Sequence, residues 1–284
     1  MLYNKEFCLK KFIKNWILPP KVAVFLWSQV TTWRVKRLDL RVLKKNIHLK
    51  DKYKGKRCFI LGNAPTIKDI DITLLKDEYV FVMSTFYHHP DFCKLKKSFF
   101  SSVHFTAVMS EKEELLYLKE IEKSTNTAAY LFFGIEQKKY IDKYSLFKNK
   151  NLFYIASSSK VRAFDISTIT RSYATNIIQT LEIAMYLGFK EIYLHSVNIN
   201  EICKNGKYEY FFDRSLMLIK DPGVNNDSTI KDFFSTVNSM ANAFNELKIV
   251  NDYAKKNKIK ICYTNKESLL KFFEYKNFNE LIKK

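Results

Sequence analysis

The chain has 284 residues, of which 47% are hydrophobic and 15% aromatic, so it can bury a substantial core and is not a disordered polymer. Its formal net charge of +19 predicts attraction to polyanions: nucleic acid, anionic lipid or phosphorylated substrates. The five cysteines are scattered without a Cys-x-x-Cys pair, which argues against a disulfide framework or a zinc site and favours a reducing compartment.

Residues 1–50 differ from the rest of the chain and predict a basic amphipathic N-terminal arm. Residues 7–18 carry apolar side chains at helical spacing with lysines between them, and residues 22–33 add two tryptophans before a basic run. Such a segment suits the headgroup boundary of an anionic membrane, whereas the apolar run at 22–30 is too short to span one. The pair Pro19-Pro20 argues against a secretory signal. We therefore expect peripheral attachment without a transmembrane helix; the alternative is that these helices pack on the core.

From residue 56 onward, short apolar runs alternate with amphipathic or polar stretches. Strands are expected at residues 58–61, 79–83, 105–108, 128–133, 152–156, 190–194 and 259–263, and helices at 110–122, 175–187 and 233–256, with a short helix or turn at 67–75. The clearest unit is the helix that Gly188 closes before a strand leading to His195. This alternation predicts an α/β fold: a Rossmann-like, mostly parallel sheet with helices on both faces, plus the N-terminal helical arm.

The turn after the first expected strand, Gly62-Asn63-Ala64-Pro65-Thr66, is the most informative segment. Gly62 lacks a Cβ and is expected to take a backbone conformation closed to other residues, while Thr66 is expected to cap a following helix. A helix that opens here points its unpaired N–H groups at an anion, so the segment predicts a phosphate site. The alternative is an ordinary strand-to-helix loop.

Polar side chains follow several other expected strands, and ligands of such sheets sit beyond the carboxyl ends of the strands. If the strand order allows it, residues far apart in the sequence converge there on one pocket. The candidates are Ser84, Thr85, Ser157, Ser158, Ser159, His195, Ser196, Val197 and Asn198.

Two motifs carry a resemblance to a known group of enzymes. Residues 62–71, Gly-Asn-Ala-Pro-Thr-Ile-Lys-Asp-Ile-Asp, resemble the GNGPSL-x-x-ID signature of the family 42 bacterial sialyltransferases and the broader 6-hydroxymethylpterin pyrophosphokinase MptE-like group (domain of unknown function 115). Residues 187–194, Leu-Gly-Phe-Lys-Glu-Ile-Tyr-Leu, match a second hallmark, which Gly-x-Asp normally follows. Residues 84–87 and 205–208 resemble two further sialyltransferase segments, and the likeness covers approximately residues 56–265.

The resemblance implies that residues 51–284 form a Rossmann-like nucleotide-sugar-binding domain that needs no metal and no cofactor. Its nucleotide-binding residues are then Gly62, Asn63, Ala64, Pro65, Thr66, Ser84, Thr85, Thr175, Asn176 and Asn198. Tyr208 and Tyr210 are then the candidates for stabilising the departing phosphate, and the other catalytic candidates are His195, which follows an expected strand, and Asp227, which lies near the position of the family's base. Phenolic donors suit a CMP leaving group, which carries a single phosphate.

Three positions depart from the family pattern. Ala64 and Ser196 stand where glycine is usual, and Asn198 stands where a ribose-binding carboxylate is expected, so nucleotide recognition is either altered or lost. The histidine that serves the sialyltransferases as general base also has no obvious counterpart downstream of His195. A general base needs reach to the acceptor hydroxyl and a suitable pKa, which leaves as candidates His88, His89, His195, Asp213 and Asp227.

The function that the resemblance implies is a metal-independent, inverting glycosyltransferase. It would move a CMP-activated sialic-acid-like (nonulosonic or related keto-acid) sugar onto a surface glycan or lipid-linked acceptor, as in bacterial lipopolysaccharide or capsule polysaccharide biosynthesis. Its partners would be a nucleotide-sugar donor, that acceptor and an anionic membrane surface. It would work in the cytoplasm, peripheral on the inner face of the cell membrane, and a homo-oligomer is left open.

Two other function classes are considered. One is an ATP-dependent pyrophosphokinase acting on a hydroxymethylpterin, whose chemistry needs clustered carboxylates for metal-bound phosphates. A variant of this class is a nucleotide-binding relative whose catalysis is altered. The other is nucleic-acid binding, which the charge alone motivates. No nucleic-acid recognition motif is present in the sequence, so we expect no specific nucleic-acid partner.

Overall fold

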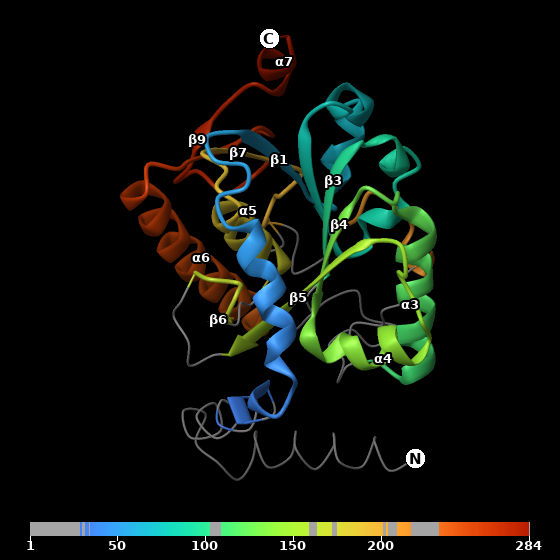
Figure 1. The fold of residues 1–284 in the computed structure, drawn as a ribbon. Helices are drawn as coiled ribbons and strands as arrows, with labels where there is room; N and C mark the ends of the chain where they lie inside the picture. The colour runs from blue at the N-terminus through green and yellow to red at the C-terminus, as the bar shows by residue number, and fades with distance from the viewer. Residues whose placement is uncertain are drawn as a thin grey trace.

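The computed structural model describes residues 29, 32–33, 35–102, 109–158, 164–171, 175–200, 203, 209–216 and 233–283. In these residues nine parallel strands form one sheet in the order β6-β5-β4-β3-β2-β1-β7-β8-β9 (Figure 1). The strands are β1 (Arg57–Leu61), β2 (Tyr79–Met83), β3 (Lys97–Ser102), β4 (Tyr130–Gly134), β5 (Asn151–Ser158), β6 (Ile169–Arg171), β7 (Glu191–His195), β8 (Lys260–Tyr263) and β9 (Glu274–Tyr275).

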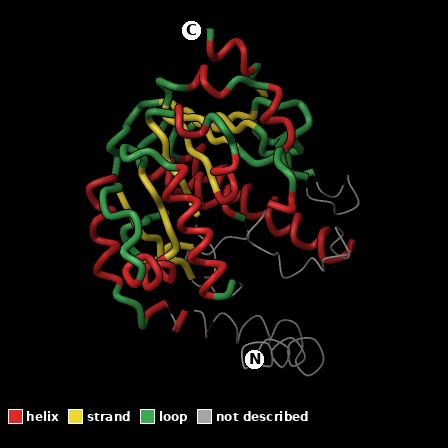
Figure 2. The backbone as a smooth tube through the Cα atoms, turned by 90° about the vertical axis from the view of Figure 1, so that its right-hand side faces the viewer, coloured by secondary structure: helices red, strands yellow, loops and turns green. Residues whose placement is uncertain are grey.

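Helices cover both faces of this sheet, and Figure 2 shows the strands gathered between them. The α-helices are α3 (Glu111–Ser124), α4 (Lys138–Lys143), α5 (Asn176–Tyr186), α6 (Phe233–Lys256) and α7 (Phe278–Ile282). The 3-10 helices are η2 (Leu40–Leu49), η3 (Pro65–Asp69), η4 (Ile72–Leu75), η5 (Ser84–His88), η6 (Phe92–Lys94), η8 (Ile135–Gln137) and η10 (Arg214–Leu216). The fold is therefore the α/β Rossmann-like sheet with helices on both faces that the sequence predicts.

The central strands are apolar on both sides, and alternate residues feed two separate cores. Cys58 and Ile60 of β1 face the core that α5 and α6 cover. Phe59 and Leu61 face the other core, which holds the apolar residues of α3, α4 and α7. This explains why β1, β2, β4, β5, β7 and β8 could be recognised as continuous apolar runs.

Some elements differ from the sequence-based expectation. Strand β3 was not predicted, because it begins with Lys-Ser and ends with Ser-Ser and so lacks an apolar pattern. Its residues Ser98, Ser101 and Ser102 are nevertheless all buried. The short edge strands β6 and β9 were also missed. The strand expected at 105–108 lies outside the described residues.

Helix η2 covers the first part of β5, because β6 pairs with this strand only at residues 156–158. Lys45 Nζ donates to the Leu152 carbonyl at 2.9 Å, and Asn46 Nδ2 donates to the Tyr154 carbonyl at 2.8 Å. These carbonyls lie two residues apart on the strand, so both point out of the same edge. Residues 40–49 belong to the expected N-terminal arm, and here they pack on the sheet.

Of the expected arm, residues 1–28, 30–31 and 34 lie outside the described residues. Among the helices that the structure describes, none combines the length and the apolar character needed to cross a bilayer.

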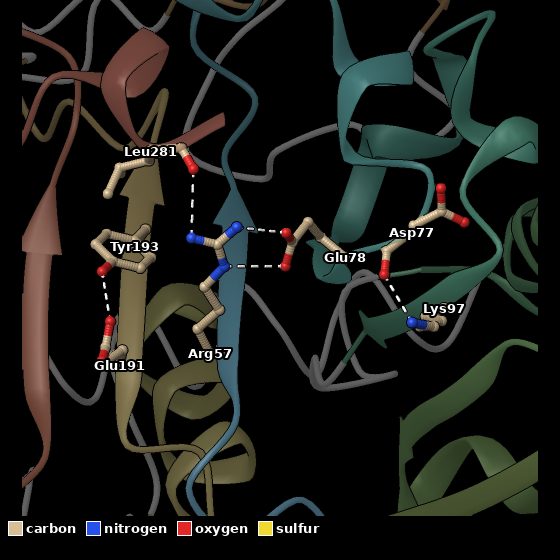
Figure 3. A network of polar contacts seen from close by, with 7 residues as sticks. All are labelled: Arg57, Asp77, Glu78, Lys97, Glu191, Tyr193 and Leu281. Carbon is tan, nitrogen blue, oxygen red and sulfur yellow. Dashed lines mark hydrogen bonds and ion pairs between the residues drawn. The ribbon is translucent and has the colours of Figure 1, made fainter. Parts of the chain in front are cut away.

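At the amino end of the sheet, Arg57 ties three elements together (Figure 3). Its Nη2 donates to Glu78 Oε1 at 2.6 Å and its Nε to Glu78 Oε2 at 3.2 Å. Its Nη1 donates to the carbonyl of Leu281 in α7 at 3.3 Å. The two-pronged contact fixes the start of β1 against the start of β2, because a guanidinium and a carboxylate match in geometry.

Candidate functional site

The two motif segments lie next to one another at the point where the strand order reverses. From β1 the chain builds β2 to β6 on one side of the sheet, and then it returns to build β7, β8 and β9 on the other side. Residues 62–66 follow β1, and residues 196–198 follow β7, which pairs with β1 in parallel along its whole length. In open α/β sheets, ligands bind outside the carboxyl ends of the strands at such a switch point. The switch point is therefore the candidate functional site.

The backbones of the two segments touch directly. Gly62 N–H donates to the His195 carbonyl at 2.8 Å, and Ala64 N–H donates to the Ser196 carbonyl at 3.3 Å. A Cβ on Gly62 would overlap the Ser196 carbonyl group, because it would lie 2.7 Å from the carbonyl carbon. The expected reason for Gly62 was wrong: its φ is outside the left-handed range, and what it provides is room for the neighbouring loop.

Thr66 does not cap a helix. The residue that precedes η3 is Ala64, without a side-chain capping bond, and η3 itself is a 3-10 helix of five residues. The short helix or turn expected at 67–75 is present as η3 and η4, and Thr66 lies inside η3 rather than preceding it. Instead, the buried Thr66 hydroxyl donates to Ser196 Oγ at 3.1 Å, and Asn198 Oδ1 is a second, more distant acceptor at 3.5 Å.

The turn after β8 completes this polar layer. Asn265 Nδ2 donates to Asn198 Oδ1 at 2.5 Å, and Ser268 Oγ donates to the Val197 carbonyl at 2.7 Å. Asn265 and Ser268 were not among the expected site residues, although polar residues directly after a buried strand were the signal that identified the others. Thr66 and Asn198, expected to touch the nucleotide, thus use their polar atoms to hold the loops together.

Two serines at the carboxyl edge of the sheet adopt a backbone conformation that favours glycine. Ser196 has φ +55° directly after β7, and Ser84 has φ +53° directly after β2. A left-handed conformation costs about 1–2 kcal/mol for a residue with a Cβ, and such residues cluster at functional sites. The sialyltransferase pattern that residues 187–194 resemble has glycine at the position of Ser196, and in this chain a serine adopts the left-handed conformation that suits glycine.

His195 is held by the protein on both ring nitrogens. Its Nδ1 lies 2.8 Å from Thr264 Oγ1, and its Nε2 lies 3.3 Å from the Thr66 carbonyl. Burial lowers its pKa, and the contact with the Thr66 carbonyl acts in the opposite direction. A neutral ring that donates from Nε2 to the Thr66 carbonyl accepts at Nδ1, and the Thr264 hydroxyl, which also lies 3.1 Å from the Leu194 carbonyl, then gives its single proton to Nδ1 rather than to that carbonyl. In this geometry His195 positions the first motif, and neither nitrogen is left for an acceptor hydroxyl.

Several polar atoms at this edge are buried and have no partner among the described residues, and three of them belong to expected nucleotide-binding residues: Asn63 Oδ1, Thr85 Oγ1 and Thr175 Oγ1. Asn63 Nδ2 donates to the Met83 carbonyl at 3.3 Å, which places Asn63 beside the end of β2. Thr175 precedes α5, and its hydroxyl makes no capping bond. Unpaired buried polar atoms are uncommon, so they indicate where a ligand or water binds.

Helix α5 brings Thr175 to the carboxyl edge. Its other end is fixed at the amino edge, since Tyr53 N–H, just before β1, donates to the Leu187 carbonyl at 2.8 Å. Gly188 closes the helix with φ +92°, as expected. The helix crosses the face of β2 and β3, so Thr175 and Asn176 lie at the opposite end, where the strands finish.

The segment at 209–213 docks on the first motif. Phe211 N–H donates to the Asn63 carbonyl at 3.0 Å. The half-buried Tyr210, the residue before Phe211, is therefore adjacent to the turn after β1. Tyr208 and Asp227 lie outside the described residues, as does Ser159.

The serines after β5 do not join this site. Three strands, β2 to β4, separate β5 from β1. Ser158 is buried, and its hydroxyl contacts that of Thr32 at 2.8 Å. The expectation that Ser157 and Ser158 converge with the other rim residues was therefore wrong, because the strand order places them far along the sheet edge.

Comparisons with known proteins give no family model and no curated protein that matches the chain. Solved structures of the sialyltransferase CstII do match. The complex of the Campylobacter jejuni protein with CMP-3FNeuAc is 17% identical over 78% of this chain and 86% of that chain, with a TM-score of 0.44. The complex with a trisaccharide acceptor and CMP is 17% identical over 78% and 85%, with a TM-score of 0.45. The complex of the Campylobacter jejuni protein with cytidine-5'-monophosphate is 18% identical over the same shares, with a TM-score of 0.45. Likenesses of this strength carry no argument about chemistry, and the fold class rests on the strand order.

Proposed function

We propose that this protein is an inverting glycosyltransferase that moves a CMP-activated sialic-acid-like sugar onto a glycan or lipid-linked acceptor. The observation that carries the proposal is the contact between residues 62–66 and 196–198 at the switch point of the sheet. Residues 62–66 resemble one sialyltransferase hallmark, and residues 196–198 directly follow the segment that resembles the other, residues 187–194. The sequence order alone does not require the two segments to meet.

The donor would lie over the two loops, because the loops themselves are in contact. Asn63, Thr85 and Thr175 supply the polar atoms that lack partners, and the half-buried Ala64 and Pro65 supply an apolar surface beside them. Ser84 and Asn176 border the same region. The donor would not contact Gly62, Thr66 and Asn198 directly. These residues would hold the two loops in place beneath it.

The leaving group would depart with help from phenols. Tyr210 lies beside the first motif through its neighbour Phe211, and Tyr208 and Asp227 remain proposed catalytic residues by the resemblance alone. A departing CMP develops charge on one phosphate, and positioned O–H donors can stabilise that charge without a metal ion. The acceptor oxygen would form its bond to the anomeric carbon as the bond to the phosphate oxygen breaks, with inversion.

Thermal-shift measurements test this proposal. The full-length protein is screened with CMP, CDP, UDP, GDP and ATP, each with and without magnesium. Stabilisation by CMP in the absence of magnesium is the expected result, because a ligand that binds only the folded state raises the melting temperature. Stabilisation by ATP with magnesium alone would overturn the choice and favour the pterin pyrophosphokinase.

The N-terminal arm is proposed to attach the enzyme to an anionic membrane that carries the acceptor. The support is sequence composition, since lysines at positions 10, 11 and 14 alternate with apolar residues. Full-length protein should float with vesicles that contain phosphatidylglycerol, and charge reversal at these three lysines should release it. Equal flotation of both proteins would contradict the role of the arm.

A further inference from the structure

The five-residue helix η5, directly after β2, combines backbone strain with unsatisfied polar atoms. It begins with Ser84 in the left-handed conformation. Thr85 Oγ1, Tyr87 OH and His88 Nε2 are all buried without a partner in the described part of the chain. A buried polar atom without a partner destabilises the fold relative to a paired one. A segment that combines a strained backbone with three buried polar atoms that lack hydrogen-bond partners has the features of a ligand site.

This helix borders the proposed donor site. Asn63 contacts the Met83 carbonyl at the start of the segment, and Phe211, which binds the Asn63 carbonyl, packs its ring 5.6 Å from that of Phe86. The next residue, Phe212, lies with its ring centroid 4.4 Å from that of His88. The segment at 209–213 thus runs from the first motif to His88.

His88 differs from the other two histidines at this edge. His195 has both ring nitrogens engaged, and His89 accepts the Asp91 N–H at Nδ1 while it stacks on Phe86 with an interplanar angle of 6°. The half-buried His88 ring is held between Tyr87, at 4.3 Å, and Phe212, at 4.4 Å, and its Nε2 has no partner in the described residues. The ring is therefore fixed in orientation with one nitrogen left for a ligand.

The charged and titratable neighbours of His88 suit a neutral ring. Burial lowers the pKa of His88, and the carboxylate of Glu120 on α3 acts in the opposite direction. Burial raises the pKa of Tyr87 to about 12, so its phenol stays protonated and does not compete for a proton. Tyr210 stands beyond Phe212, with its ring 5.4 Å from the Phe212 ring. A neutral imidazole at neutral pH can accept a proton during the reaction.

We propose that His88 is the general base of this enzyme and that it takes the proton from a sugar hydroxyl of the acceptor. This assignment rests on the proposed transferase function. As the acceptor oxygen bonds to the anomeric carbon, its O–H bond breaks and the proton passes to His88 Nε2. The bond between the anomeric carbon and the phosphate oxygen breaks with its electron pair on CMP, and His88 later releases the proton to water. The rings of Phe212 and Tyr210 give the acceptor sugar an apolar surface beside this nitrogen.

The experiment measures CMP binding and CMP release from CMP-N-acetylneuraminic acid, with water or lactose as the acceptor. The full-length wild type is compared with His88→Gln, His88→Ala and the control His48→Gln, which changes an exposed histidine on η2. We expect both His88 variants to bind CMP as the wild type does, and their release rate to fall by about 10²–10⁴-fold. The control should keep the wild-type rate.

Two further readouts separate a base from a structural residue. The wild-type rate should fall as the pH drops below the pKa of His88, and this limb should be absent in His88→Gln. Added imidazole should restore activity to His88→Ala but not to His88→Gln, since only the alanine leaves space for it.

The outcomes are distinguishable. Wild-type release rates in His88→Gln with intact CMP binding would overturn the role of His88 and leave the transferase proposal standing. Failure of the wild type to bind CMP would overturn both. A wild type that binds CMP but releases none from the donor, with or without lactose, would also overturn the assignment, because no hydroxyl is being activated.

Discussion

The α-carbon of Gly62 lies so close to the Ser196 carbonyl that no side chain fits between them. The two loops at the switch point are therefore a single unit, joined by two backbone hydrogen bonds and by the Thr66 hydroxyl. Because both contacting partners are backbone, neither can swing away to make room.

Replacement of Gly62 by alanine should therefore push the loops apart. We expect a loss of about 3 kcal/mol in the free energy of unfolding, as for overpacking of a buried site, together with weakened CMP binding. The control is Gly55→Ala, which has φ +77° but nothing within 4 Å of the new Cβ. That variant should lose about 1 kcal/mol through backbone strain and bind CMP normally. Equal effects of the two variants in urea unfolding would contradict the direct contact.

Ser196 should behave as a strained residue. Its φ of +55° is costly with a Cβ, so Ser196→Gly should be more stable than Ser196→Ala by about 1 kcal/mol. Both variants remove the hydroxyl that accepts from Thr66, so their difference isolates the backbone. Thermal unfolding of the pair checks the prediction, and an alanine variant as stable as the glycine variant would refute it.

Asn63 should be needed for donor binding, in addition to the hydrogen bond that its Nδ2 donates to the Met83 carbonyl. Its Oδ1 lacks a partner in the described residues, so Asn63→Ala removes a potential ligand contact. Loss of one hydrogen bond should raise the dissociation constant for CMP about tenfold, which corresponds to about 1.4 kcal/mol. Calorimetric titration measures this, with the exposed Asn151→Ala as the control. Unchanged affinity would place the donor elsewhere.

Glu182 should make stability depend on pH. It is buried in α5, Thr170 donates to its Oε1, and burial raises its pKa to about 8 from the usual 4.5. Between these values the folded protein keeps a proton that the unfolded chain releases, so stability is full below pH 4.5 and falls until pH 8. The slope is at most about 1.4 kcal/mol per pH unit. Glu182→Gln should lack this component, and urea unfolding of both proteins across the range measures it. Parallel curves would show that Glu182 does not titrate there.

The pair of Arg57 and Glu78 should stabilise the amino end of the sheet. Its side chains are 30% and 25% exposed, whereas those of Lys96 and Asp77 are 67% and 66% exposed. A double-mutant cycle with Arg57→Gln and Glu78→Gln should give a coupling energy of about 1 kcal/mol. The same cycle on Lys96 and Asp77 should show no measurable coupling. Similar values for both pairs would mean that burial and the two-pronged geometry do not matter.

The sequence was a good guide to the fold where the strands are buried on both faces. Such strands must be apolar at every position, so β1, β2, β4, β5, β7 and β8 were recognised nearly in full, and α6 was recognised from its first to its last residue. The sequence did not predict β3, because its serines, although buried, are typical of a loop. It also did not predict the two-residue strand β9. Burial of small polar residues depends on neighbouring strands, which a local pattern does not contain.

For the site, the sequence identified which loops follow strands but not what each side chain does there. Gly62 and Thr66 were assigned ligand contacts, whereas the structure uses them against Ser196, 130 positions away from Thr66 in the chain. Those contacts follow from the adjacency of β1 and β7, which periodicity cannot reveal. His88 was one of several candidates, and its fixed ring became apparent only through Phe212.

The cover that η2 places over β5 limits where the protein can be shortened. A chain that starts at residue 51 would lose Lys45 and Asn46, and the carbonyls of Leu152 and Tyr154 would face outward with nothing bonded to them. Exposed strand edges recruit strands from other molecules, so such a truncation should form insoluble assemblies. A soluble version without the basic arm must keep the residues from Leu40 onward.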